Sequence, residues 1–149
     1  LQGDMPTISS KAINNLVNLQ NSINSDIFTL ANEIKDESEK KDPNVVKVAI
    51  AINNDNTYGK ALYFSRASIP YGEGPLYHHI GIYAYSRKSL EKFIKLKASK
   101  LELRESLEQL RALEASMDIK VGIVDEFPIG VDNLADFKKA CEYIKNNKE

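Results

Sequence analysis

The chain has 149 residues and a formal net charge of −1, with 42% hydrophobic and 28% charged residues. This composition is typical of a single globular domain, and the near-zero charge excludes an overall positive field that would attract nucleic acid or an anionic membrane. The best candidate for a membrane-spanning run, Val45 to Ile52, is too short and is interrupted by Lys47. The single cysteine, Cys141, excludes an internal disulfide and indicates a reducing compartment.

Helical and strand patterns alternate through the first third of the chain. Ser9 or Ser10 is placed to cap a first helix, and residues 26–31 read as a short strand. The mixed-charge run 35–42 is most simply a solvated helix face or loop. The β-branched segment 45–52 predicts a further strand.

The alternation continues to the C-terminus. The expected elements are strands at 61–66, 79–85 and 119–124 and helices at 89–96, 103–117 and 133–144. The helix at 103–117 is predicted from apolar residues, mostly leucines, that recur at the spacing of one helical stripe. Asn133 is placed to cap the last helix. Strands with helices between them predict one three-layer α/β domain over residues 1–149, with a mixed sheet and flanking helices.

Two aspartates lie at turns next to predicted elements. Asp4 follows a glycine at an apolar strand end, and Asp132 precedes the last helix. A carboxylate at the carboxyl end of a strand in an α/β sheet can hold Mg²⁺ against phosphates. Asp4 can equally be only a turn residue, and Asp132 can share the capping of the helix with Asn133.

The strand at 79–85 has an unusually polar face. His79, Gly81, Tyr83 and Tyr85 share this face, because side chains alternate along a strand. His78 points the other way, so the two histidines do not chelate one metal ion together. The face either meets a ligand or is covered by a helix that satisfies its hydroxyl groups.

The predicted helix at 103–117 also carries polar residues away from its leucines. Glu108 lies nearly opposite the leucine stripe, with Gln109 and Arg111 on its flanks. On spacing alone these residues form a solvated polar face.

Six blocks of the sequence together resemble one enzyme family. The blocks are LQGDMP, DPNVVKVA, ALYFSRASIPY, HIGIYAY, SLEQLRALE and IGVDNLADF. In this order and approximate spacing, from residue 1 to about 145, they resemble the 3-deoxy-manno-octulosonate (Kdo) cytidylyltransferases, also called CMP-Kdo synthetases. The sialic acid cytidylyltransferases are a more distant resemblance.

The resemblance implies an activity. Such an enzyme transfers CMP from CTP to Kdo with release of pyrophosphate, uses Mg²⁺, acts in the cytoplasm in lipopolysaccharide biosynthesis and forms a homodimer. Its partners are then CTP and Kdo, with no nucleic acid and no membrane.

The resemblance also implies site residues. Asp4 and Asp132 match the two aspartates that hold Mg²⁺. The positions that match the Kdo pocket are Arg66, His79, Tyr83, Glu108 and Gln109, with Gln2 at the pocket edge. A guanidinium or an imidazole can pair the sugar carboxylate, and the Glu and Gln side chains can fix its hydroxyl groups.

In that family the Gln-Gly-Asp turn is internal and follows a nucleotide-binding segment with a glycine-, arginine- and lysine-containing loop for the CTP triphosphate. We therefore expect this chain to be the sugar-binding and dimer-forming part, lacking the N-terminal nucleotide-binding portion and releasing little or no pyrophosphate alone. The chain departs from the family at Met5, Ser86 and the short loop 71–77. There are two alternatives. The chain is a non-catalytic dimerisation or sugar-binding remnant, or it is a cytidylyltransferase for another acidic sugar such as sialic acid.

Overall fold

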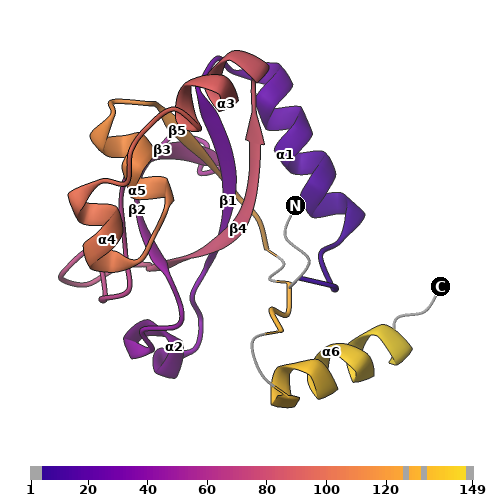
Figure 1. Cartoon of the computed structure of the whole chain (residues 1–149). Coiled ribbons are helices and arrows are strands. Elements are labelled where there is room, and N and C mark those ends of the chain that lie inside the picture. Colours follow the sequence, from indigo (N-terminus) through magenta and orange to yellow (C-terminus); the bar gives the residue numbers. More distant parts are fainter. Residues whose placement is uncertain (1–4, 126–127, 132–133, 147–149) are drawn as a thin grey trace.

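The computed structural model describes residues 5–125, 128–131 and 134–146, and its centre is a five-stranded mixed sheet (Figure 1). The strands are β1 (Ile27–Glu33), β2 (Lys47–Ile52), β3 (Tyr58–Ser65), β4 (Tyr77–Tyr85) and β5 (Ile119–Ile123). They are joined in the order β1-β4-β2-β3-β5, and β5 returns to pair in parallel with β1, so the sheet closes into a barrel. All the other pairs are antiparallel.

The closure depends on a narrow contact between β2 and β4. Lys47 is paired with His78, and the backbone N–H of His79 donates to the carbonyl of Val46 at 2.8 Å. This contact brings the start of β2 next to the polar face of β4.

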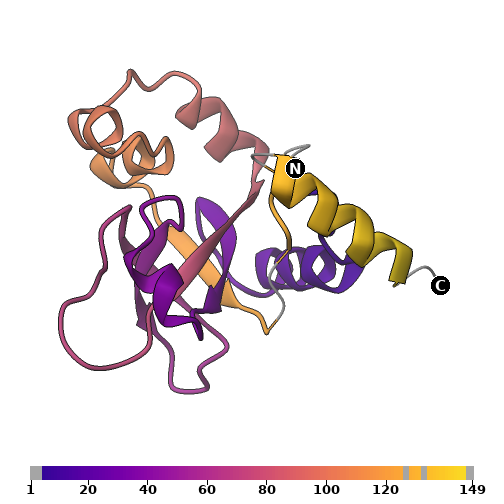
Figure 2. The ribbon, with the colours of Figure 1, turned by 90° about the horizontal axis from the view of Figure 1, so that it is seen from below.

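Helices cover the sheet on both sides. The helices of the described residues are α1 (Ser10–Ser22), α2 (Glu37–Lys41), α3 (Arg87–Phe93), α4 (Lys100–Glu105), α5 (Gln109–Glu114) and α6 (Leu134–Asn146). Helix α1 packs on β1, β4 and β5, while α3 and α5 contact β4 and β3 from the other side (Figures 1 and 2). Ser9 caps α1, because its hydroxyl oxygen accepts from the N–H of Ala12 at 3.0 Å. The predicted α/β fold with a mixed sheet and flanking helices is confirmed.

Two apolar clusters hold these layers together. Under α1, the cluster contains Leu16 together with Leu30 of β1 and Ile80 of β4. On the opposite side, Phe64 and Leu110 are fully buried in a larger cluster that joins the barrel to α3 and α5. Because alternate residues of β1 and β4 belong to different clusters, the sheet is buried on both faces.

The prediction of a single helix at 103–117 is wrong. Ser106 has φ 55° and ends α4, and α5 begins three residues later at Gln109. The apolar spacing continues through the break, since Leu107 is buried, but Leu103 is 70% exposed. A capping box at Ser99 fixes the start of α4, and because Ser106 ends this helix, the segment folds as two short helices that contact each other.

An ion pair joins these two helices. Arg111 donates from Nε to Oε2 of Glu102 at 2.8 Å and from Nη2 to the other carboxylate oxygen, and its guanidinium lies 5.3 Å above the ring of Phe93. The hydrogen bonds from Arg111 hold the pKa of the Glu102 carboxyl below its usual range. Both side chains are mostly buried, at 17% and 12% exposed.

We expect Arg111→Lys to lower the free energy of unfolding by about 1–2 kcal/mol, because an ammonium group cannot make the paired bonds or stack on the ring. Urea denaturation measures the change. The matched control is Arg87→Lys, which alters an exposed pair with Glu91 and should cost less than about 0.5 kcal/mol. Equal effects of the two substitutions would contradict this account of the arginine.

The C-terminal helix presents apolar residues to solvent. Ala140 is buried, but Phe137 is 54% exposed and Ile144 is 39% exposed, and Cys141 is partly buried. The described residues therefore leave much of this face uncovered. No helix in the described part of the chain is long and apolar enough to cross a membrane.

Candidate functional site

A cavity of about 280 Å³ lies between β4 and the connection from α4 to α5. Its lining residues are Val46, His79, Gly81, Tyr83, Ser106, Leu107, Glu108 and Gln109. Four residues predicted for the sugar pocket are thus brought together from two segments about thirty positions apart in the sequence.

One wall of the cavity depends on the left-handed backbone of Ser106. This turn directs Leu107 into the core and places Glu108 and Gln109 on the cavity. Gln109 is buried, whereas the Glu108 side chain is 68% exposed and lies 3.5 Å from Nη2 of Arg111. Since Glu102 holds the guanidinium of Arg111, the Glu108 carboxylate has a fixed positive neighbour at the rim.

The other wall is the polar face of β4. His79, Gly81 and Tyr83 all line the cavity, while Ile80 and Ile82 pack in the cluster beneath α1. The prediction that these odd-numbered residues share a face is therefore confirmed. Figures 1 and 2 show β4 between α1 and the helices α3 to α5.

Burial keeps the groups on this wall uncharged. It lowers the pKa of His79 to about 3, with a smaller contribution from His78, so His79 is neutral near pH 7. Burial also raises the pKa of Tyr83, with smaller contributions in the same direction from its neighbours Tyr85 and Glu108. The cavity wall therefore offers hydrogen-bonding groups, and His79 does not supply the positive charge that an imidazole was expected to offer a carboxylate.

Arg66 lies beside the cavity rather than among its lining residues. It follows β3, and its Nε donates to the carbonyl of Glu105 at 3.0 Å while Nη1 donates to the carbonyl of Pro43 at 3.0 Å. Because Glu105 directly precedes the cavity wall, the bond to its carbonyl connects Arg66 to this wall.

Glu105 is a site-supporting residue that the sequence patterns did not reveal. Its carboxylate accepts from the Ser65 hydroxyl at 2.9 Å, from the backbone N–H of Arg66 at 3.1 Å and from the Tyr63 hydroxyl at 3.4 Å. One side chain thus ties the end of β3 to the cavity wall. No local spacing indicates this role, since the partners are about forty residues away.

Lys47 is a second site-supporting residue that the sequence patterns did not reveal. Its side chain is fully buried, and Nζ donates to the carbonyl of Asp42 at 2.5 Å and to that of Arg66 at 3.4 Å. Desolvation lowers the pKa of this ammonium group. The sequence does carry a signal for Lys47, because a charged residue inside an apolar strand indicates that its side chain has a specific polar partner.

Gln2, Asp4 and Asp132 lie outside the described residues, so the magnesium pair stays a prediction. Within the described ranges, no three acidic, histidine or cysteine side chains gather as a metal site would require.

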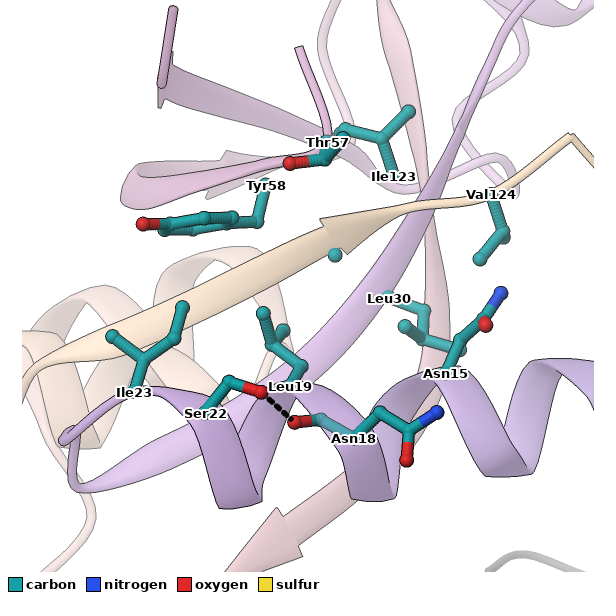
Figure 3. A pocket seen from close by; sticks show the side chains of 11 residues that line it. Asn15, Asn18, Leu19, Ser22, Ile23, Leu30, Thr57, Tyr58, Ile123 and Val124 are labelled. Carbon is teal, nitrogen blue, oxygen red and sulfur yellow. Dashed lines mark hydrogen bonds between the residues drawn. The ribbon is translucent and has the colours of Figure 1, made fainter. Parts of the chain in front are cut away.

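A second cavity, of about 540 Å³, lies between α1 and β5 (Figure 3). Its lining includes Leu19 and Leu30, together with Asn15 and Asn18 on α1 (Figure 3). Among the predicted sugar-pocket residues that the structure describes, none lines this cavity.

Comparison with known proteins gives consistent similarities. Residues 1–119 match the family model described as cytidylyltransferase. The 3-deoxy-manno-octulosonate cytidylyltransferase of Rhizobium meliloti (strain 1021) is 56% identical over 140 residues, which are 94% of this chain and 56% of that protein. The protein of the same name from Bartonella henselae (strain ATCC 49882 / DSM 28221 / CCUG 30454 / Houston 1) is 55% identical over 145 residues, which are 97% of this chain and 59% of that protein.

A solved structure shares the fold. It is CMP:2-keto-3-deoxy-manno-octonic acid synthetase complexed with CTP, which has a TM-score of 0.87 and 33% identity over 99% of this chain and 61% of that chain. This chain therefore spans a little under two thirds of that structure and a little over half of the curated relatives.

Proposed function

Because the chain belongs to the cytidylyltransferase family, we propose that it forms the sugar-binding part of an enzyme that transfers CMP from CTP to Kdo and releases pyrophosphate. The resemblance to the Kdo cytidylyltransferases is confirmed by the similar relatives of that name. The observation that carries the proposal is the cavity where His79, Tyr83, Glu108 and Gln109 meet. These are four of the positions that the resemblance assigns to the Kdo pocket.

The chemistry of the cavity suits a polyhydroxylated acid. A neutral histidine, a protonated tyrosine and a buried amide can each exchange hydrogen bonds with sugar hydroxyl groups. Arg66 is the cation that we assign to the sugar carboxylate, since a guanidinium pairs well with this group. These contacts would hold the anomeric hydroxyl in line for attack on the α-phosphorus of CTP, with pyrophosphate as the leaving group.

We assign Mg²⁺ to Asp4 and Asp132 on the family resemblance, because hard carboxylate oxygens are the ligands that this ion prefers. When bound, the ion supplies neutralisation of the phosphate charge. The side chains of this chain then contribute binding and orientation rather than covalent chemistry.

We also assign the enzyme to the cytoplasm, to lipopolysaccharide biosynthesis and to a homodimer, as the resemblance implies. The exposed apolar side chains of Leu62 and Tyr71 are compatible with a dimer contact. Light scattering that shows only monomer at high protein concentration would count against the dimer.

Titration calorimetry with Kdo tests the proposed ligand. We expect saturable binding to the chain, and we expect Gln109→Ala to weaken it by about tenfold or more, because a buried polar partner of the sugar is lost. The matched control is Asn18→Ala, which removes an exposed amide at the other cavity and should leave the affinity unchanged. Binding of sialic acid but not Kdo would favour the alternative cytidylyltransferase, and equal losses in the two variants would refute this site.

A further inference from the structure

We propose that Thr29 fixes the imidazole of His79 with its hydrogen on Nε2, so that Nδ1 faces the cavity as an acceptor for a sugar hydroxyl. Thr29 is a residue of β1 that neither the sequence patterns nor the resemblance singled out. The sugar part of the inference rests on the proposed function, whereas the state of the ring does not.

The hydroxyl of Thr29 has three neighbours and one hydrogen. Its Oγ1 lies 2.9 Å from Nε2 of His79, 2.8 Å from the carbonyl oxygen of Ile82 and 3.1 Å from that of Ile80. Carbonyl oxygens can only accept, so the hydroxyl hydrogen belongs to one of them. The lone pairs of Oγ1 are then left to accept a hydrogen bond from Nε2.

The other neutral form of His79, with the hydrogen on Nδ1, makes fewer hydrogen bonds. If Nε2 carried no hydrogen, it would be a third acceptor competing for the single hydroxyl hydrogen of Thr29. One bond would form instead of two at a residue that is fully buried. Since buried polar atoms without partners are strongly disfavoured, the network selects the Nε2–H form of His79.

The backbone creates this arrangement. The pairing of β1 with β4 shifts between Thr29 and Leu30, because Thr29 is opposite Tyr83 whereas Leu30 is opposite Ile80. This bulge in β4 brings two carbonyl groups to one hydroxyl. Bulges commonly re-aim side chains next to functional sites.

The other ring nitrogen is left for the cavity. Within the described residues, the imidazole of His79 makes its hydrogen bond through Nε2, and no buried side-chain nitrogen or oxygen lacks a partner. Nδ1 is therefore not sealed inside the protein, and His79 is a lining residue of the cavity. Phe64 packs edge-on against the ring with centroids 4.9 Å apart, which helps to hold this orientation.

This arrangement makes the corner of the cavity selective. A bare Nδ1 accepts a hydrogen bond from a neutral hydroxyl but repels a carboxylate, and the low pKa of His79 keeps the ring uncharged near pH 7. An acidic sugar would therefore place a hydroxyl here and its carboxylate elsewhere. Thr29 acts as a positioning residue, because it works through His79.

Nitrogen-15 NMR of histidine-labelled chain tests the ring directly. For His79 we expect an Nε2 signal of the protonated type and an Nδ1 signal of the unprotonated type before any ligand is added. Thr29→Val removes the hydroxyl at similar volume and should give a mixture of the two forms, whereas Thr29→Ser should keep the wild-type pattern. A wild-type signal with the hydrogen on Nδ1 would overturn the proposal, and this spectrum requires no variant to fold.

Addition of Kdo tests the acceptor role. We expect the Nδ1 resonance to move on binding, and Thr29→Val to weaken binding by about tenfold while Thr29→Ser stays close to wild type. Kdo binding without a change at Nδ1 would overturn the acceptor role but leave the proposed function intact. Absence of Kdo binding would overturn the proposed function and the acceptor role together, while the ligand-free spectrum would still decide how Thr29 sets the ring.

Discussion

Lowering the pH from 7 to 5 is expected to reduce the free energy of unfolding by about 4 kcal/mol, with about 2 kcal/mol from each of His78 and His79. Burial is the main cause in both cases and lowers the pKa of His78 to about 4 and that of His79 to about 3. The positive charge of Lys47 adds to the shift of His78. An unfolded histidine has a pKa near 6.5.

The sign follows from these values. Below about pH 6.5 the unfolded chain binds protons at both histidines while the folded protein keeps them neutral, so protonation favours unfolding. The stabilisation that depends on the two neutral histidines is fully present above about pH 6.5 and is lost as the pH falls toward their pKa values in the folded protein. The carboxyl groups of Glu102 and Asp118 have lowered pKa values, so most of their effect falls at lower pH.

Urea denaturation at pH 7, 6 and 5 measures this dependence, and His79→Gln supplies the control. Whatever the absolute stability of the variant, its slope of unfolding free energy against pH between pH 6 and 5 should be about half that of the wild type. An unchanged slope would show that His79 is accessible to protons in the folded state, contrary to its burial.

Glu105→Ala is expected to lower the free energy of unfolding by about 3 kcal/mol and to weaken Kdo binding by at least about tenfold. The substitution removes the acceptor of the Ser65 hydroxyl and of the Arg66 N–H, and hydrogen bonds to a charged group are worth about 1.5–3 kcal/mol each. The cavity wall at 106–109 follows directly in the chain, so its position should be lost together with that of Arg66.

Urea denaturation and Kdo calorimetry measure the two effects. Glu105→Gln retains one acceptor oxygen and should lie between the alanine variant and the wild type. Glu91→Ala is the matched control, because it removes an exposed glutamate of an i,i+4 pair and should cost less than about 0.5 kcal/mol. If the two alanine variants behaved alike, Glu105 would not organise the site.

The strands were largely predictable from the sequence. The segment 45–52 and the aromatic-rich segment 79–85 are apolar enough to be strands, and both lie largely within β2 and β4. The closure of the sheet was not predictable, because it depends on one pairing between Lys47 and His78. The end of α4 at Ser106 was also not predictable, because the apolar spacing continues across it.

The candidate site was predictable in part. Strand alternation alone placed His79 and Tyr83 on one face, but Glu108 and Gln109 joined them only through the family resemblance, because their spacing suggested a solvated helix face. The contribution of Thr29 could not be predicted, since it depends on a bulge and on atoms fifty residues away.

Mapping the amide chemical shifts of the nitrogen-15-labelled chain during titration with Kdo tests the central claim most directly. The account predicts that the largest changes lie at 79–83 and 106–109, around the cavity between β4 and the α4–α5 connection. Changes centred instead on Leu19, Tyr58 and Val124, which line the cavity of Figure 3, would contradict it.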